Sequence, residues 1–190
     1  MTDKARGETP SKPHRLPGDP DRATMVERMI RVDHAGEHGA VRIYQGQLAV
    51  LRHGPAARAI RHMADQEKAH LAAFDKLLIE RRVRPTALSP LWDVAGFALG
   101  AASALLGPKA AMACTVAVEE VIEEHYRDQA ETLGDDDPAL KETISDFRDD
   151  EMAHGATALE YGAREAPLYE ALSSVVKGGA RLAIWLSTRV

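Results

Sequence analysis

Polar and apolar residues mix in long segments along the chain, and glycine and proline separate these segments at a few points. The segments are rich in Ala, Leu, Glu and Arg and contain few β-branched runs, a composition that favours helix. Because Gly and Pro mark helix ends, their positions set the expected boundaries. The predicted helices cover residues 21–52, 56–83, 91–106, 108–134 and 138–164, and a last one follows Pro167 to the C-terminus.

The four long predicted helices are comparable in length and have short connections, except for the link over residues 84–108. Two helix hairpins joined by a crossover are typical of ferritin-like bundles. We therefore expect an all-α, ferritin-like four-helix bundle with an apolar crossover and an additional C-terminal helix, over residues 22–190. Residues 1–21 are polar, contain four prolines and lack an apolar stretch, so we expect a flexible tail and no signal peptide.

Two short motifs repeat between the halves of the chain. Glu67 and His70 in one predicted helix, and Glu151 and His154 in another, lie three residues apart, which puts each pair on one helix face. A single pair of this kind is usually solvated, whereas two matched copies predict a shared site.

The other two long helices share a second spacing, in which a Glu is followed seven residues later by Tyr and ten later by Gln. The copies are Glu37, Tyr44 and Gln47, and Glu119, Tyr126 and Gln129. This match selects Glu119 from its neighbours Glu120, Glu123 and Glu124. The separations also agree, with 30 residues from Glu37 to Glu67 and 32 from Glu119 to Glu151. The two halves thus predict a pseudo-twofold site.

The repeats place four glutamates and two histidines toward the interior of four helices, which is the ligand set of dinuclear iron and manganese bundles. Four buried carboxylates would repel one another and be costly to desolvate, and two divalent cations would cancel their charge. Oxygen ligands with one imidazole per metal suit iron or manganese. The predicted ligands are Glu37, Glu67, His70, Glu119, Glu151 and His154.

Other polar residues near these motifs have two interpretations. Asp150 either holds a ligand histidine by its second ring nitrogen or is an exposed acid. Tyr44 and Tyr126 either line the site or pack in the core. His34 either supports the site or makes a plain polar contact.

Charge and cysteine content exclude several classes of function. With 24 basic and 29 acidic residues the net charge is −5, which argues against a general nucleic-acid binder. The one cysteine, Cys114, cannot form an internal disulfide, a Cys-x-x-Cys redox pair or a four-cysteine iron site. Its small apolar neighbours predict a buried side chain.

Longer motifs extend from about residue 23 to the C-terminus. They are RVDHAGE at 31–37, RIY at 42–44, DQEKAH at 65–70, RPT at 84–86, PLW at 90–92, GFALG at 96–100 and ACTVAVEE at 113–120. Together they resemble the demethoxyubiquinone hydroxylase family of ubiquinone biosynthesis, in a bacterial form. One departure is His38, where the family is expected to have Tyr; it adjoins Glu37 but should point to a different helix face.

The resemblance implies a dioxygen-dependent di-iron monooxygenase that hydroxylates the ring of demethoxyubiquinone in the penultimate step of ubiquinone biosynthesis. By matching position, it assigns Glu37, Glu67 and His70 to one iron and Glu119, Glu151 and His154 to the other, with Glu67 and Glu151 bridging both. One oxygen atom would enter the ring and the other would leave as water. The resemblance suggests NADH as the reductant, but the chain has no Gly-rich dinucleotide fingerprint, so reduction through the quinol substrate stays open.

A substrate with a long isoprenoid tail requires contact with a bilayer. The strongest apolar stretch, Leu91 to Gly107, is 17 residues long and contains Asp93. It falls short of the roughly 20 apolar residues of a spanning helix. The last helix has an apolar stripe with Trp185 beside it, and the nearby cations Lys177, Arg181 and Arg189 are placed to meet lipid phosphates. Both segments could instead bury against the bundle or another subunit.

We therefore expect a peripheral protein on the cytoplasmic side of the cell inner membrane. Its expected partners are demethoxyubiquinone, a lipid surface, and either a second copy of the chain or accessory proteins of ubiquinone biosynthesis, with no nucleic acid. Three alternatives share part of the pattern: a ferritin-type iron-oxidising or storage protein, a manganese catalase, and a scaffold with a vestigial site. The apolar crossover argues against the first, and the complete ligand set against the last.

Overall fold

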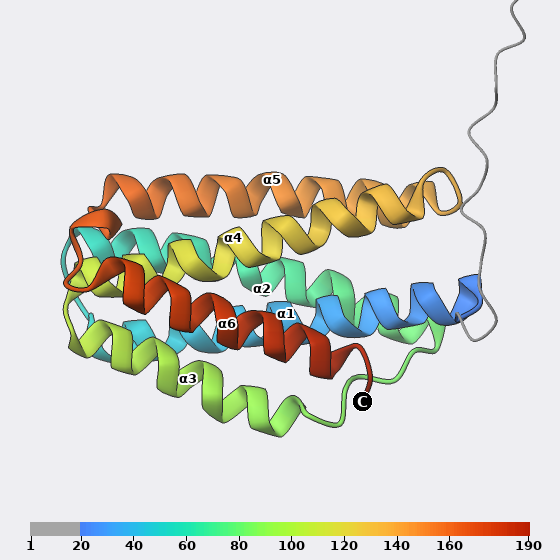
Figure 1. Ribbon diagram of the computed structural model, residues 1–190, viewed down its shortest axis with the longest axis horizontal. Helices are drawn as coiled ribbons and strands as arrows, with labels where there is room; N and C mark the ends of the chain where they lie inside the picture. Colours follow the sequence, from blue (N-terminus) through green and yellow to red (C-terminus); the bar gives the residue numbers. More distant parts are fainter. Residues whose placement is uncertain (1–19) are drawn as a thin grey trace, which may run out of the picture.

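The computed structural model describes residues 20–190, which form six α-helices and one short 3-10 helix. Figure 1 shows the helices running side by side along the long axis of the molecule. The elements are α1 (Arg22–Val50), α2 (Pro55–Arg81), α3 (Ser89–Leu105), α4 (Pro108–Leu133), α5 (Pro138–Glu160), η1 (Ala163–Glu165) and α6 (Tyr169–Ser187). The tail predicted for residues 1–21 lies almost wholly outside the described residues.

The helix starts follow the capping residues in the sequence. The Asp21 carboxylate accepts a hydrogen bond from the Thr24 backbone N–H at 2.7 Å, and Asp137 caps α5 in the same way through Leu140. The helices α2, α4 and α5 each begin with a proline, which suits the first turn. The predicted end of the fourth long helix near residue 164 is wrong. The helix ends at Glu160, because Gly162 takes a φ of +84° and turns the chain into η1.

The bundle consists of two helix hairpins. The helix α1 packs on α2, and α4 packs on α5, while α3 covers α1 and α6 covers α4. Figure 1 shows α3 and α6 on the same side of the molecule. The predicted all-α, ferritin-like bundle with an apolar crossover and an extra C-terminal helix is confirmed.

Close backbone contact joins the crossover helix α3 to α1. A Cβ atom added to Gly46 would lie 2.2 Å from the Phe97 carbonyl oxygen, and one added to Gly100 would lie 1.9 Å from the Ile43 carbonyl oxygen. Because no side chain fits in either space, these two glycines let α3 lie directly against α1.

Many of the exposed large apolar side chains lie on α3 and α6 or close to the ends of these helices. On α3 and at its end they are Leu91, Val94, Leu105 and Leu106, and on or beside α6 they are Leu168, Val175, Leu182 and Trp185. Within residues 20–190, no helix has both the length and the hydropathy needed to cross a membrane.

Candidate metal centre

The six predicted ligands come together in the interior of the bundle. The helix α1 contributes Glu37, α2 contributes Glu67 and His70, α4 contributes Glu119, and α5 contributes Glu151 and His154. None is more than 3% exposed. Residues that are widely separated in sequence thus share one enclosed site, because each of the four helices turns the face that carries its ligands toward the interior of the bundle.

The ligand atoms form two overlapping groups within which all atoms lie within 4.8 Å of one another. One group is Glu37, Glu67, His70 and Glu151, and the other is Glu67, Glu119, Glu151 and His154. Glu67 and Glu151 belong to both groups. Nδ1 of His154 lies 3.0 Å from Oε1 of Glu67 and 3.3 Å from Oε2 of Glu151. This is the arrangement expected for two metal ions that share two carboxylates.

Many polar atoms of this cluster have no hydrogen-bond partner among the described residues. They are Oε2 of Glu37, both carboxylate oxygens of Glu67 and of Glu151, Oε2 of Glu119, and Nδ1 of His70 and of His154. Buried polar atoms without partners are costly, and each of these is an electron-pair donor. Two divalent cations would satisfy them together, so the residues present fit a dinuclear metal centre.

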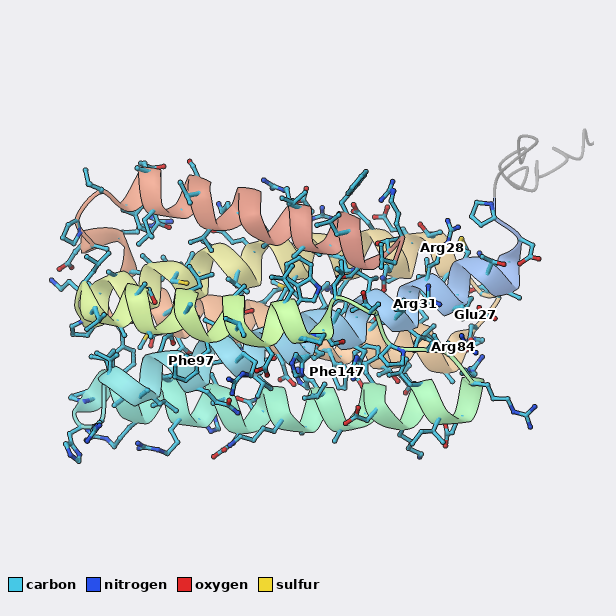
Figure 2. The ribbon with its side chains drawn as sticks, turned by 90° about the horizontal axis from the view of Figure 1, so that it is seen from below. Glu27, Arg28, Arg31, Arg84, Phe97 and Phe147 are labelled. Atoms are coloured by element: carbon cyan, nitrogen blue, oxygen red, sulfur yellow. The ribbon has the colours of Figure 1, made fainter. Side chains whose placement is uncertain are left out.

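The outward nitrogen of each histidine is held by a neighbour. Nε2 of His70 lies 3.0 Å from Oδ2 of Asp150, and Nε2 of His154 lies 3.3 Å from Oε1 of Gln66. The ring of Phe147, labelled in Figure 2, stacks on His70 with the ring centroids 4.0 Å apart. These contacts leave Nδ1 of both histidines facing the carboxylates, as metal-binding histidines require. Of the two interpretations of Asp150, the structure supports the histidine contact.

The two repeated tyrosines connect the halves of the centre. The hydroxyl of Tyr44 on α1 donates to Glu119 on α4, and the hydroxyl of Tyr126 on α4 donates to Glu37 on α1. Both tyrosines therefore touch predicted ligands, beyond simple packing in the core. By contrast, Nε2 of His34 lies 3.0 Å from Oδ1 of Asp75, which is a plain polar contact.

Two other sequence predictions concern residues near the centre. The side chain of His38 faces the crossover helix, with Nε2 3.4 Å from Oδ1 of Asp93 on α3. This agrees with the expectation that it points away from the face of Glu37. Cys114 is fully buried, as its neighbours predicted.

Burial and mutual repulsion control the protonation of the metal-free centre. Burial, followed by the neighbouring carboxylates, raises the pKa of Glu67 and of Glu119 well above the usual range. Burial acts in the same direction on Glu151, but contacts with His154 and His70 outweigh it and lower the pKa of Glu151 to about 2. Burial lowers the pKa of His70, yet Glu151 and Glu37 outweigh burial and raise that pKa to about 10. The metal-free centre therefore holds protons that cations would displace.

A cavity of about 440 Å³ lies among α1, α3, α4 and α6. Its wall is mostly apolar and includes Ile43, Leu99 and Val176. Tyr126 also lines it, and the hydroxyl of this residue donates to Glu37. One side chain thus borders both the cavity and the predicted metal ligands.

Sequence reasoning missed a polar group in the wall of this cavity. Nε2 of His125 lies 3.1 Å from Oδ1 of Asp33, and Nε2 of Gln129 lies 2.7 Å from the same oxygen. Burial raises the pKa of Asp33, and the contacts with His125 and Gln129 oppose that rise. A signal was present, because Gln129 is one of the repeated residues and Asp33 stands four residues before Glu37.

A ferritin-like bundle whose interior gathers four glutamates and two histidines has the fold and side-chain set of the dinuclear carboxylate proteins. The family model described as "Ubiquinone biosynthesis protein COQ7" matches residues 24–187. The chain therefore belongs to the COQ7 family of ubiquinone biosynthesis proteins, as the motif resemblance predicted.

Individual relatives agree with this assignment. A 3-demethoxyubiquinol 3-hydroxylase of Rhodospirillum rubrum is 60% identical over 177 residues, which cover 93% of this chain and 84% of that protein. A human protein named as a mitochondrial NADPH-dependent 3-demethoxyubiquinone 3-hydroxylase is 53% identical over 169 residues, or 87% of this chain and 78% of the relative. The mitochondrial 5-demethoxyubiquinone hydroxylase of Saccharomyces cerevisiae is 41% identical over 185 residues, or 88% and 79% of the two chains. These relatives give no support to the storage, catalase or scaffold alternatives.

Proposed function

We propose that this chain hydroxylates the ring of demethoxyubiquinone in ubiquinone biosynthesis, using two iron ions held by Glu37, Glu67, His70, Glu119, Glu151 and His154. The relatives' names support the reaction and the substrate. The observation that carries the proposal is the position of Tyr126, whose side chain lines an apolar cavity while its hydroxyl donates to Glu37. A ring bound in that cavity lies beside the proposed metal ligands.

The protein's own residues prepare the centre and the pocket. When bound, the two iron ions would supply the redox chemistry that splits dioxygen, so that one oxygen atom enters the ring and the other leaves as water. Tyr44 and Tyr126 each hold one carboxylate in place from the opposite half of the bundle. The apolar cavity wall excludes water from the reacting ring. The electrons come from outside the chain, and we propose a nicotinamide nucleotide as their source, in line with the names of several relatives.

Product analysis tests this function directly. The purified chain, loaded with iron and supplied with reductant, dioxygen and a short-chain demethoxyquinone, is expected to yield the hydroxylated ring, identified by mass spectrometry. A parallel sample loaded with manganese tests the metal identity. Iron-loaded protein that binds two metal ions and forms no hydroxylated ring would contradict the proposal.

We also propose that the chain binds the membrane surface through α3 and α6. These helices expose large apolar residues, among them Val94 at 67%, Val175 at 74% and Trp185 at 52%, and Val175 also lines the cavity. An isoprenoid tail leaving the cavity between these helices would emerge at the same surface. The proposed location is the cytoplasmic side of the cell inner membrane.

The cations near this surface have different surroundings. Lys177 and Arg181 form ion pairs with Glu120 and Glu124 of α4, so they attach α6 to the bundle. The guanidinium of Arg189 lies over the ring of Trp185, 4.1 Å from its centre. We therefore assign lipid-phosphate contact to Arg189 and not to the two paired cations.

Liposome flotation tests the membrane proposal. The unaltered protein should float with vesicles that contain anionic lipid. The double variant Val175→Glu/Trp185→Glu should stay in the soluble fraction, because burying each added charge in the interface is costly. Ile79→Glu is the matched control, since Ile79 is 78% exposed but belongs to α2. Equal flotation of the double variant and the control would rule out this surface.

A further inference from the structure

The wall of the cavity contains a group with titratable side chains that the proposed metal centre does not use. It consists of Asp33 on α1 and His125 on α4, both of which line the cavity, together with Gln129 behind them. Most of the remaining wall is apolar. Ligand pockets commonly pair an apolar wall with a few placed polar groups that orient the ligand.

Asp33 and Gln129 both contact Nε2 of the His125 ring. Its Nε2 faces Oδ1 of Asp33 at 3.1 Å, and the side-chain amide of Gln129 donates to that same oxygen at 2.7 Å. The same amide nitrogen lies 2.8 Å from Nε2 of His125, so this ring nitrogen contacts both Asp33 and Gln129. Nδ1 of His125 has no hydrogen-bond partner among residues 20–190. The side chain is 20% exposed and lines the cavity.

The internal repeat shows that the bundle does not require this group. Asp33 precedes Glu37 by four residues, and its counterpart four residues before Glu119 is Thr115. His125 follows Glu119 by six residues, and its counterpart six residues after Glu37 is Ile43. The two equivalent positions are thus occupied by a hydroxyl side chain, Thr115, and an aliphatic side chain, Ile43.

The repeated glutamines show the same difference in their contacts. Gln47 donates to Thr115 Oγ1 at 3.3 Å and to the Ala111 carbonyl oxygen at 3.0 Å, whereas Gln129 donates to the carboxylate of Asp33. The scaffold position is shared, but Asp33 and His125 are titratable, whereas their counterparts Thr115 and Ile43 are not.

Keeping Asp33 in this place is costly. Its side chain is fully buried, and Oδ2 has no hydrogen-bond partner among the described residues. An unpartnered buried carboxylate oxygen destabilises the fold, and Thr115 shows that the bundle can close without one. The carboxylate of Asp33 is explained if it holds His125 in position to contact a ligand.

We propose that His125 contacts the substrate ring, with Nδ1 hydrogen-bonded to a ring hydroxyl of the quinol form. Asp33 and Gln129 are positioning residues that hold the imidazole. This inference rests on the proposed function, because it takes the ligand of the cavity to be a quinol.

Binding measurements separate this contact from general apolar affinity. Isothermal titration of the iron-loaded protein, under anaerobic conditions in one detergent, compares two probes. One is a short-chain demethoxyquinol, and the other has the same ring and tail but lacks both hydroxyls. The unaltered protein should prefer the quinol. In His125→Phe, that preference should fall roughly fivefold to tenfold, the value of one neutral hydrogen bond, while affinity for the second probe stays the same.

Two further variants complete the test. Asp33→Asn preserves the shape of the cavity and should also reduce the preference for the quinol, so it decides the question if His125→Phe does not fold. Thr115→Val is the control, since it alters the equivalent position in the other half and should leave the preference unchanged. If His125→Phe folds and its preference for the quinol is unchanged, the proposed contact is wrong. If His125→Phe does not fold, an unchanged preference in Asp33→Asn has the same meaning.

The two proposals fail in different ways. Protein that forms hydroxylated product but shows no dependence on His125 overturns the contact and leaves the proposed function intact. Protein that distinguishes the probes through His125 but forms no product overturns the proposed function.

Discussion

Replacing Asp150 tests the metal centre without removing any proposed ligand. Oδ2 of Asp150 lies 3.0 Å from Nε2 of His70, and the Asp150 side chain is 44% exposed. The adjacent Asp149 is 70% exposed and instead pairs with Arg148. In Asp150→Ala, His70 loses the acceptor that turns its Nδ1 toward Glu37 and Glu151.

The expected loss follows from the strength of that contact. A hydrogen bond to a charged group contributes roughly 1.5–3 kcal/mol, and the partial exposure of Asp150 favours the lower end. Since 1.4 kcal/mol is about a factor of ten in affinity, we expect about tenfold weaker binding of the metal ion that His70 holds. Losses of about 10–100-fold are typical when a metal-bound histidine loses such a partner. The stability of the metal-free protein should change by less than about 1 kcal/mol, because a half-exposed contact contributes little.

Competition titration against a chromophoric chelator measures the two metal affinities separately. Asp149→Ala is the matched control and should bind both ions like the unaltered chain. Asp150→Asn should recover part of the affinity, because its amide oxygen still accepts a hydrogen bond from His70. If Asp150→Ala binds both ions as tightly as Asp149→Ala does, the argument is refuted.

The remaining predictions concern the ligands, the pH dependence and the packing of α3. Glu67→Ala and Glu151→Ala should each abolish metal binding and hydroxylation, since both residues belong to both ligand groups. Metal analysis and product analysis check this, and the control Glu120→Ala should retain both properties. Retained turnover in either ligand variant would contradict the assignment. The metal-free protein should be less stable near pH 8 than near pH 5. The pKa values of Glu67, Glu119 and His70 are raised in the folded chain, whereas the unfolded chain releases these protons above the ordinary pKa values of 4.5 for Glu and 6.5 for His. Because the folded state then binds more protons than the unfolded state, its stability falls as the pH rises. The lowered pKa of Glu151 adds stability that is lost only as the pH falls from 4.5 through about 2, so it does not alter this comparison. Denaturant titration at pH 5 and at pH 8 measures the difference in the free energy of unfolding. Gly100→Ala should destabilise the protein by about 1–3 kcal/mol, because its Cβ would lie 1.9 Å from the Ile43 carbonyl oxygen. Gly178→Ala, with nothing within 4 Å of its added Cβ, should be neutral or stabilising by up to about 1 kcal/mol in the same thermal unfolding assay.

Local signals in the sequence were enough to predict the helices. Asp21 and Asp137 cap helices, and prolines begin three of them, so most predicted boundaries lie within a few residues of those observed. The exception is the end of α5 at Glu160. The segment that follows has a helix-compatible composition, and the left-handed turn at Gly162 was not anticipated.

The sequence by itself determined the fold class, the family and the six candidate ligands. Spacing along one helix is regular, so the repeated Glu, Tyr and Gln positions show which residues share a face. That is why Glu119 could be selected from four nearby acids before its surroundings were known. The role of the six residues as metal ligands stays a prediction.

Only the tertiary structure decided how the helices meet. It paired Tyr44 with Glu119 and Tyr126 with Glu37 across the bundle, and it placed Asp33 beside His125 in the cavity wall. These contacts depend on how far each helix is rotated and shifted against its neighbour. The glycine contacts between α1 and α3, together with the packing of α6 on α4, set that rotation and leave the cavity between them. Spacing within one helix carries no information about the offset between two helices, because that offset is the outcome of packing all the side chains at once.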